Sequence, residues 1–299
     1  MKQFLPIHQW TKTKMTQNIT MELQEFEEPE EIQSTNFAFS RYLYVIDDVK
    51  SSLLLSILDH EPKEALYWAY ELYFSGFKDD AFTTLLNISN SMYSPKVHRF
   101  VQQQKTKWEE HPEQYWIVGT VVWYLADRPA NIADFAAEFC QDPELIQQIK
   151  NNPITHRRAT NIAIFLEEKD VQAYINVETG RPDQLLKHVL KHPPRTQVAK
   201  IFEHDHATYS AHTLYEMWSK NWLYYAAKSS IWQQRIESHN GIIDHAQKVV
   251  TFEDDDMDEQ FNDKYYYDTD EQPRQIVELC LGKKEPQWTW KQFYDHYTN

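Results

Sequence analysis

Residues 61–76, EPKEALYWAYELYFSG, decide the fold class of this chain. Apolar side chains recur there every three or four positions: Leu66, Tyr67, Tyr70 and Tyr73. At that spacing they gather along one face of a helix. Pro62 stands in the first turn, where a helix tolerates proline, and Gly76 follows the last apolar residue in the way that helices commonly end. The stretch therefore predicts a helix that is opened by proline, closed by glycine and packed against a partner.

The neighbouring segments repeat this pattern. Asp47 and Asp48 are residues favoured at a helix start, and aliphatic side chains face one way from there to Leu58. Ser94-Pro95 and His111-Pro112 open two more helices. The predicted helices cover 47–58, 62–76, 79–88, 95–108 and 115–126. Short links between helices favour antiparallel hairpins, and no fixed-period repeat is present. We therefore predict a mainly α fold, an irregular array of short antiparallel helical hairpins.

After residue 152 the pattern is less regular. Ile162–Leu166 fits a short strand or a helix, Thr213–Ile236 predicts the strongest helix of this half, and Val249–Phe252 predicts a short strand. We expect little β structure, all of it in the C-terminal half. The predicted parts are an acidic, disordered N-terminal tail (1–36), a helical-hairpin domain (37–152) and a second, mainly helical region (153–299) with an acidic loop at 253–259.

Net charge, cysteine number and the length of the most apolar stretch limit the possible functions. The 299 residues include 45 acids and 30 bases, a net charge of −15, which disfavours nonspecific nucleic-acid binding. The two cysteines, Cys140 and Cys280, are too few for a disulfide framework or a cysteine-based zinc site, so a reducing compartment fits best. The most apolar stretch, Tyr115–Ala126, is shorter than the roughly 20 residues that span a bilayer. No membrane span is expected.

Glycine is scarce, and its positions exclude whole classes of chemistry. The five glycines are Gly76, Gly119, Gly180, Gly241 and Gly282. None lies close enough to another to form a dinucleotide-binding GxGxxG, a P-loop or a GxSxG nucleophile turn, all of which need paired glycines. We expect no cofactor.

Histidines provide one candidate metal site. Its residues are His188, His192, His204 and His206. His188 and His192 stand four apart on a predicted helix, so their rings share a face and could bind one ion. Val189 occupies the position of the general-base Glu in HExxH, which excludes a zincin. The competing and favoured interpretation is that these are structural histidines beside an apolar stripe.

Acidic residues provide the other candidate ligands, Asp254, Asp256 and Asp258. An EF-hand is excluded because no glycine occurs between residues 242 and 281. A solvated acidic loop that leads into a helix start is the simpler interpretation. If the histidines and these carboxylates converged on one pocket, an enzyme would gain support.

A locally basic stretch overlaps the histidines. It consists of Lys187, Lys191, Arg195 and Lys200. Such a patch could contact a phosphate or the chain's own acidic tail. A solvated helix face is the favoured alternative.

Three blocks carry a family resemblance: Arg41–Asp48 (RYLYVIDD), Ala65–Gly76 (ALYWAYELYFSG) and Phe252–Gln272 (FEDDDMDEQFNDKYYYDTDEQ). Over about residues 37–285 the chain resembles an uncharacterised protein family encoded by nucleocytoplasmic large DNA viruses. The resemblance implies a viral protein located in the host cytoplasm, the viral factory or the virion. It implies no function for any named residue.

The leading hypothesis for function is a non-enzymatic viral scaffold or adaptor that binds other proteins, viral or host, through helical surfaces. Predicted hairpins, the 14% aromatic content and the absence of phosphate-binding or nucleophile motifs motivate it. One alternative is a nucleic-acid-associated accessory factor in viral transcription or replication, motivated by the basic stretch and nearby rings. The other is a metal-dependent hydrolase that uses the histidines or the acidic residues.

Overall fold

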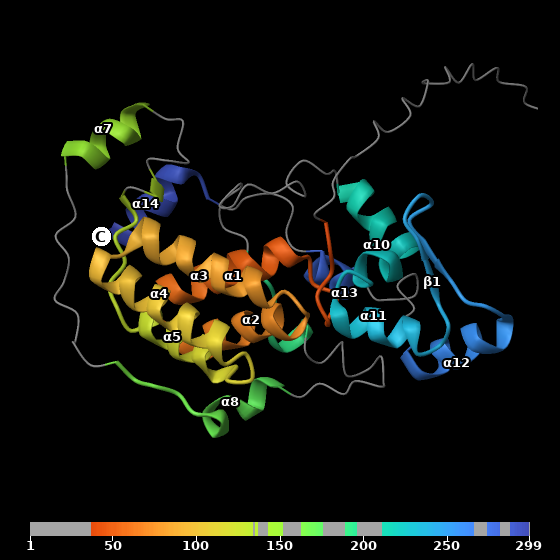
Figure 1. Cartoon of the computed structure of the whole chain (residues 1–299). Helices are drawn as coiled ribbons and strands as arrows, with labels where there is room; N and C mark the ends of the chain where they lie inside the picture. Colours follow the sequence, from red (N-terminus) through yellow and green to blue (C-terminus); the bar gives the residue numbers. More distant parts are fainter. Residues whose placement is uncertain are drawn as a thin grey trace, which may run out of the picture. The chain divides into compact units, whose positions relative to one another are not determined.

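Five successive helices form the first half of the described chain (Figure 1). They are α1 (Ile46–Leu58), α2 (Pro62–Phe74), α3 (Lys78–Met92), α4 (Pro95–Glu110) and α5 (Trp116–Ala126). α2 packs against α1, α3 and α5, and α4 contacts both α3 and α5. The predicted helices are confirmed, and so is the array of adjacent packed helices.

The computed structural model describes residues 37–133, 135–136, 143–151, 163–175, 189–195, 211–265, 274–281 and 288–298. The remaining helices there are α7 (Pro143–Asn151), α8 (Glu168–Ile175), α10 (Ala211–Ala226), α11 (Ser230–Glu237), α12 (Asp255–Tyr265), α13 (Arg274–Cys280) and α14 (Trp290–Thr298). Two short strands, β1 (Ile242–Asp244) and β2 (Val249–Thr251), pair antiparallel with Ile242 opposite Thr251. The mainly α class is confirmed, with this small sheet in the C-terminal half.

α2 is buried on every side. All residues from Ala65 to Tyr73 are buried, not only the predicted apolar face, because α1, α3, α5 and α8 surround the helix. Gly119 of α5 permits a close approach to α2: a Cβ there would lie 2.6 Å from the Tyr70 hydroxyl oxygen. α2 is therefore the central helix of the hairpin array.

Gly76 ends α2 as predicted. Its φ of +99° lies in the left-handed region that favours glycine. A Cβ at this position would lie 2.5 Å from Ser230 Oγ, at the start of α11. The Ser230 amide also donates to the Ser75 carbonyl at 3.1 Å. Glycine thus both ends the helix and lets α11 pack against its C-terminal end.

Three predictions for the second half need correction. Thr213–Ile236 is not one helix: α10 and α11 are separated by a turn, and α10 has a kink at Asn221 (φ −125°). A turn there frees the Ser230 amide from helical bonding, and that amide donates to the Ser75 carbonyl at 3.1 Å, which attaches the start of α11 to the end of α2. Residues 163–167 are neither strand nor helix. The expected acidic loop is partly helical, since Asp255–Glu259 form the first turns of α12.

The predicted division of the chain into a tail and two helical parts stays a prediction. The predicted tail lies outside the described residues. Buried side chains from both 37–152 and 153–299 belong to one hydrophobic core. The boundary at 152–153 adjoins residues 152–162, which are also outside the described ones, and it stays a prediction. No helix in the described part is long and apolar enough to cross a bilayer.

Candidate functional site

A buried turn, Ser40–Tyr44, connects several helices. The Leu43 amide donates to the Ser40 carbonyl at 3.0 Å, and the Tyr44 amide donates to Ser40 Oγ at 3.1 Å. Leu43 has a φ of +63°, a conformation that a non-glycine residue adopts only at a cost of about 1 kcal/mol or more. Surrounding contacts must therefore hold the turn in place.

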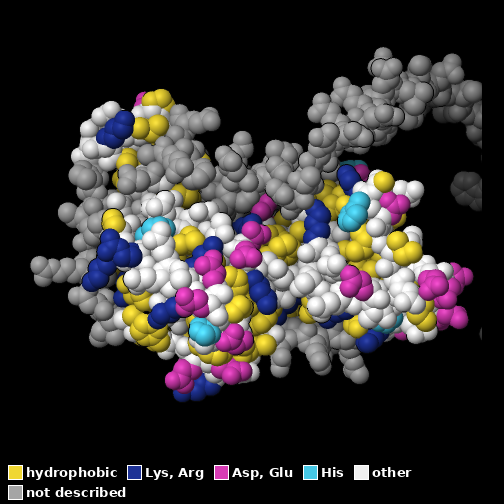
Figure 2. Space-filling model, in the orientation of Figure 1, with side chains coloured by type: hydrophobic (Ala, Val, Ile, Leu, Met, Phe, Trp, Pro, Cys, Tyr) yellow, Lys and Arg dark blue, Asp and Glu magenta, His cyan; other side chains and the backbone are white. Residues whose placement is uncertain are grey.

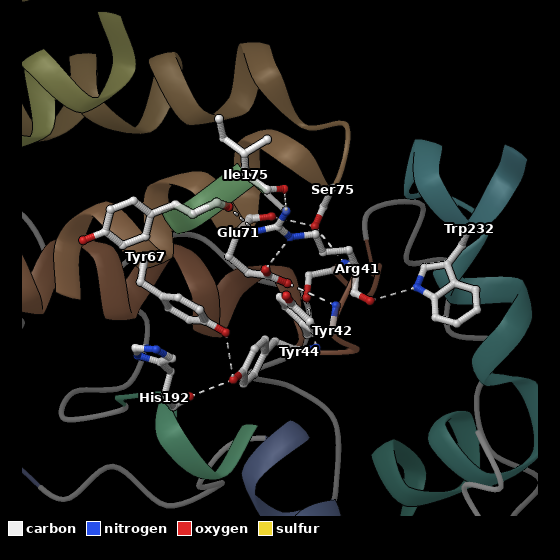
Figure 3. A network of polar contacts seen from close by, with 11 residues as sticks. Arg41, Tyr42, Tyr44, Tyr67, Glu71, Ser75, Ile175, His192 and Trp232 are labelled. Atoms are coloured by element: carbon white, nitrogen blue, oxygen red, sulfur yellow. Dashed lines mark hydrogen bonds and ion pairs between the residues drawn. The ribbon is translucent and has the colours of Figure 1, made fainter. Parts of the chain in front are cut away.

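Arg41 makes the central contact of this turn (Figure 3). Its Nε donates to Glu71 Oε2 at 2.8 Å, and the side chains of Arg41 and Glu71 are only 4% and 0% exposed. The other oxygen of Glu71 accepts the Tyr42 amide at 3.1 Å. A buried ion pair is tolerated when hydrogen bonds satisfy the remaining polar atoms, and both oxygens of this carboxylate are satisfied.

The same turn also binds two other helices. Arg41 donates to the carbonyls of Tyr174 at 3.0 Å and Ile175 at 3.2 Å, at the C-terminal end of α8, where carbonyls lack helical partners. A cation there is also favoured by the helix dipole. From α11, Trp232 Nε1 donates to the Arg41 carbonyl at 3.2 Å (Figure 3). Arg41 thus joins α2, α8 and α11.

A pair of tyrosines extends the network. The Tyr44 and Tyr67 hydroxyls lie 3.3 Å apart, and the Tyr44 hydroxyl donates to the His192 carbonyl at 2.8 Å. The His192 ring stacks on the Tyr67 ring, with centroids 3.6 Å apart and planes at 14° (Figure 3). Burial, reinforced by the neighbouring phenol, raises the pKa of Tyr44 well above its usual value, and burial does the same for Tyr67. Both phenols stay neutral at physiological pH.

Arg195 lies against the α1–α2 junction. Its guanidinium contacts the carboxylates of Asp59, Glu61 (2.5 Å) and Glu64 (2.6 Å), and its amide donates to Ser52 Oγ at 2.8 Å. Burial opposes the charge of Arg195, but Glu64, Asp59 and Glu61 outweigh it and raise the pKa of the guanidinium. Three carboxylates therefore surround one cation.

The pKa values of Glu61 and Glu64 are shifted in opposite directions. A hydrogen bond with Glu64 and burial raise the pKa of Glu61, against the pull of Arg195. Burial by itself would raise the pKa of Glu64, but hydrogen bonds from Glu61 and Arg195 outweigh it, and the pKa of Glu64 is lowered. Glu61 is thus the member of the pair on which a proton is held more readily.

The polar groups of the Arg41 and Arg195 clusters have a structural role in the described part of the chain. The ionisable side chains of both clusters bind other parts of the same chain, and the buried phenols are neutral. Such an arrangement holds helices together and orients the segment 189–195. It supplies neither a free base nor an activated nucleophile.

The structure accounts for three residues of the predicted histidine and basic stretch. His192 is a packing and hydrogen-bonding residue on Tyr67 and Tyr44, and Arg195 is paired with acids. Lys191 is exposed. The other predicted residues, His188, His204, His206, Lys187 and Lys200, lie outside the described residues, so a metal site or basic patch that includes them stays a prediction.

The predicted acidic ligands lie at the start of α12. Asp254 caps this helix, because its Oδ1 accepts the Met257 amide at 2.8 Å. Asp258 Oδ1 accepts from Asn262 Nδ2 at 3.0 Å, and Asp256 is exposed in the first turn. Across the described segments, no three His, Cys, Asp or Glu side chains are grouped so that they could hold a metal ion.

Sequence reasoning missed the Arg41–Glu71 pair. Its signal was a charged residue inside each of two largely apolar stretches, FAFSRYLYV and ALYWAYELYF. Arginine and glutamate are almost never fully buried unless they are paired, so one such residue in each of two core segments suggests that they meet. That signal does not identify the carbonyls of α8 or Trp232 as further partners.

A different surface is apolar and basic. Ile164 and Phe165 are 45% and 59% exposed, while the next residue is anchored, since the Leu166 amide donates to Thr120 Oγ1 at 3.0 Å. The Phe165 ring lies 6.1 Å from Phe100, and Lys107 Nζ lies 6.0 Å from its centroid. Figure 2 shows hydrophobic side chains beside Lys and Arg over α4 and the segment before α8, at the lower left.

The helix beside this segment carries an unusual charge pattern. Residues 95–108 of α4 contain no Asp or Glu, in a chain of net charge −15. Lys96, Arg99, Gln103 and Lys107 follow helical spacing and share one face, with Phe100 at its edge. Lys96, Arg99 and Lys107 are exposed, and none of them forms an ion pair with any residue that the structure describes. We call Ile164, Phe165 and this face of α4 the α4 patch.

Comparison with known proteins adds no identity: no family model, no curated protein and no solved structure matches the chain. The resemblance to a viral family stays a prediction.

Proposed function

We propose that this protein is a non-enzymatic scaffold or adaptor that binds another protein through the α4 patch. The observation that carries the proposal is the exposure of Ile164 and Phe165, with Lys107 Nζ 6.0 Å from the Phe165 ring. Lys96 and Arg99 lie exposed on the same face of α4 as Lys107. Two adjacent exposed apolar side chains bordered by cations resemble the aromatic anchor and charged rim that interfaces commonly use.

Charge indicates the chemistry of the partner. The basic face of α4 favours a segment with acidic residues around one apolar side chain, which would pack on Phe165 while its carboxylates meet the lysines and Arg99. The nearby acids at the start of α8 and just before it have internal partners: Glu167 pairs with Lys169 at 2.7 Å, and Glu168 accepts the Tyr115 hydroxyl at 2.8 Å. We further propose a viral or host partner in infected cytoplasm, the viral factory or the virion.

The test compares two exposed apolar positions. The full chain, Phe165→Ser and the matched control Ile242→Ser are used as baits, because Ile242 is 63% exposed on β1 and lies outside the patch. We expect wild type and Ile242→Ser to capture the same protein and Phe165→Ser to lose it. The captured protein, once purified, should bind the purified wild-type chain again. The proposal fails if no protein depends on Phe165.

The same variants separate the alternatives. A labelled single-stranded oligonucleotide is titrated at rising salt. If it binds with a steep salt dependence, and Lys96→Glu and Phe165→Ser abolish that binding, the accessory-factor hypothesis replaces the scaffold. A stoichiometric metal in the purified protein by elemental analysis would instead favour the hydrolase.

A further inference from the structure

The segment 189–195, VLKHPPR, lies on α1 and α2 in the manner of a bound peptide. Val189 is fully buried, the His192 ring stacks on Tyr67, and Arg195 ends the segment among carboxylates. Two backbone contacts fix its direction: the Tyr44 hydroxyl binds the His192 carbonyl, and the Arg195 amide binds Ser52 Oγ at 2.8 Å. We call this segment the strap.

Val189–Lys191 form the end of a helix, and His192–Arg195 continue without regular structure, so this second part is the one that compares with an extended bound peptide. Pro193 and Pro194 restrict the backbone between the ring and the guanidinium, so less conformational entropy is lost when the strap is ordered. Extended proline segments are commonly recognised on aromatic surfaces, and here the ring contact is between Tyr67 and His192, the residue before the prolines. Tyr67 is the aromatic element here, and Asp59, Glu61 and Glu64 are the acidic element.

The acidic element has more charge than the strap uses. Three carboxylates meet one guanidinium, and the only other polar contact to Asp59 among the described residues is the neutral Tyr297 hydroxyl at 2.8 Å. All three carboxylates are partly exposed, with Glu61 at 50%. The surface is therefore more acidic than its present occupant requires, and a segment with additional basic residues complements it better.

We propose that the surface formed by Ser52, Asp59, Glu61, Glu64 and Tyr67 is a receptor site for a basic segment of a partner protein with the order ring–Pro–Pro–Arg. The strap fills this site in cis, and the partner segment replaces it. This site is distinct from the α4 patch, and it does not depend on the function proposed there.

The test uses a labelled peptide with the strap sequence, VLKHPPR, titrated into the full chain by fluorescence anisotropy. In wild type, the tethered strap competes at an effective concentration of about millimolar, which keeps peptide binding weak. Arg195→Ala removes the carboxylate contacts of the strap and leaves the receptor residues intact. We expect this variant to bind the peptide at least about tenfold more tightly than wild type.

Matched controls make the result specific. Lys191→Ala alters an exposed residue of the same strap and should bind the peptide as weakly as wild type does. In the Arg195→Ala background, Glu64→Gln should reverse the gain, and a VLKHPPA peptide should bind about tenfold more weakly than VLKHPPR. The inference is overturned if the folded Arg195→Ala protein binds no better than wild type, or binds both peptides equally.

A second measurement uses the wild-type chain, so it can be made even if Arg195→Ala does not fold. A VLKHPPR peptide with a photoreactive group in place of the His ring is cross-linked to wild-type chain at millimolar concentration, and the attachment is mapped by mass spectrometry. Attachment to α1 or α2 near Tyr67 supports the receptor site. Attachment elsewhere, or none, overturns it.

Discussion

The two arginine clusters, around Arg41 and Arg195, both balance a guanidinium charge with carboxylates, one in the core and the other near the surface. Arg41 is 4% exposed and meets one carboxylate, and its other bonds go to backbone carbonyls. Arg195 is 22% exposed and meets three carboxylates. A buried charge must be balanced closely because an unpaired one costs several kcal/mol, whereas water screens an excess at the surface. The first cluster is therefore a permanent structural element, and the second is suited to exchange.

Breaking the buried pair should have the largest effect on stability. Glu71→Gln leaves the Arg41 guanidinium buried beside a neutral amide, so we expect the free energy of unfolding to fall by about 3–5 kcal/mol. Urea denaturation followed by circular dichroism measures it. The matched control is Glu109→Gln, which removes the half-exposed partner of Lys105 on α4 and should cost about 0.3–0.5 kcal/mol. Equal losses in the two variants would contradict the contrast between buried and exposed pairs.

Removing Arg195 should destabilise the chain less than Glu71→Gln. Arg195 meets three carboxylates in ion pairs that are partly exposed, so Arg195→Ala should lower the free energy of unfolding by about 1.5 kcal/mol, and 1 M NaCl should reduce that difference. The measurement is urea denaturation of both proteins at low and high salt. A salt-independent loss as large as that of Glu71→Gln would show that the Arg195 cluster is as indispensable as the buried pair.

The stability contributed by the Arg195 cluster should also depend on pH, through Glu61. Because the pKa of Glu61 is raised in the folded state, its stabilising contribution is complete below the ordinary glutamate value and is lost as the pH rises through the raised pKa. Glu61→Gln imitates the protonated form. At pH 7 the variant should be more stable than wild type by less than about 1 kcal/mol.

Below about pH 4 both forms of residue 61 are neutral, and the difference in melting temperature between wild type and Glu61→Gln should vanish. A stabilisation that persists at that pH would assign the effect to packing rather than to the extra carboxylate.

Lys191→Ala should have the smallest effect. Lys191 is exposed between the residues that anchor the strap, so its replacement should change the free energy of unfolding by no more than about 0.5 kcal/mol. Urea denaturation again provides the measurement. A loss comparable to that of Arg195→Ala would mean that the whole strap is held by charge and not by its ring and its terminal guanidinium.

The sequence by itself determined the mainly α class and the bounds of the first five helices to within a few residues. Spacing of apolar side chains, together with proline and glycine at the ends, is local information, and local periodicity is enough to specify such helices. The sequence also excluded the phosphate-binding and nucleophile motifs that need paired glycines, because each of those motifs is a continuous stretch of the chain.

Only the tertiary structure decided which polar residues meet. Arg41 pairs with Glu71 and the end of α8, and Arg195 reaches three acids more than 130 positions earlier. No periodicity connects residues at such separations. The break between α10 and α11 also involves a distant segment, because the amide of Ser230, at the start of α11, donates to the Ser75 carbonyl at the end of α2. Local patterns specify elements, but long-range packing selects the partners of each charge.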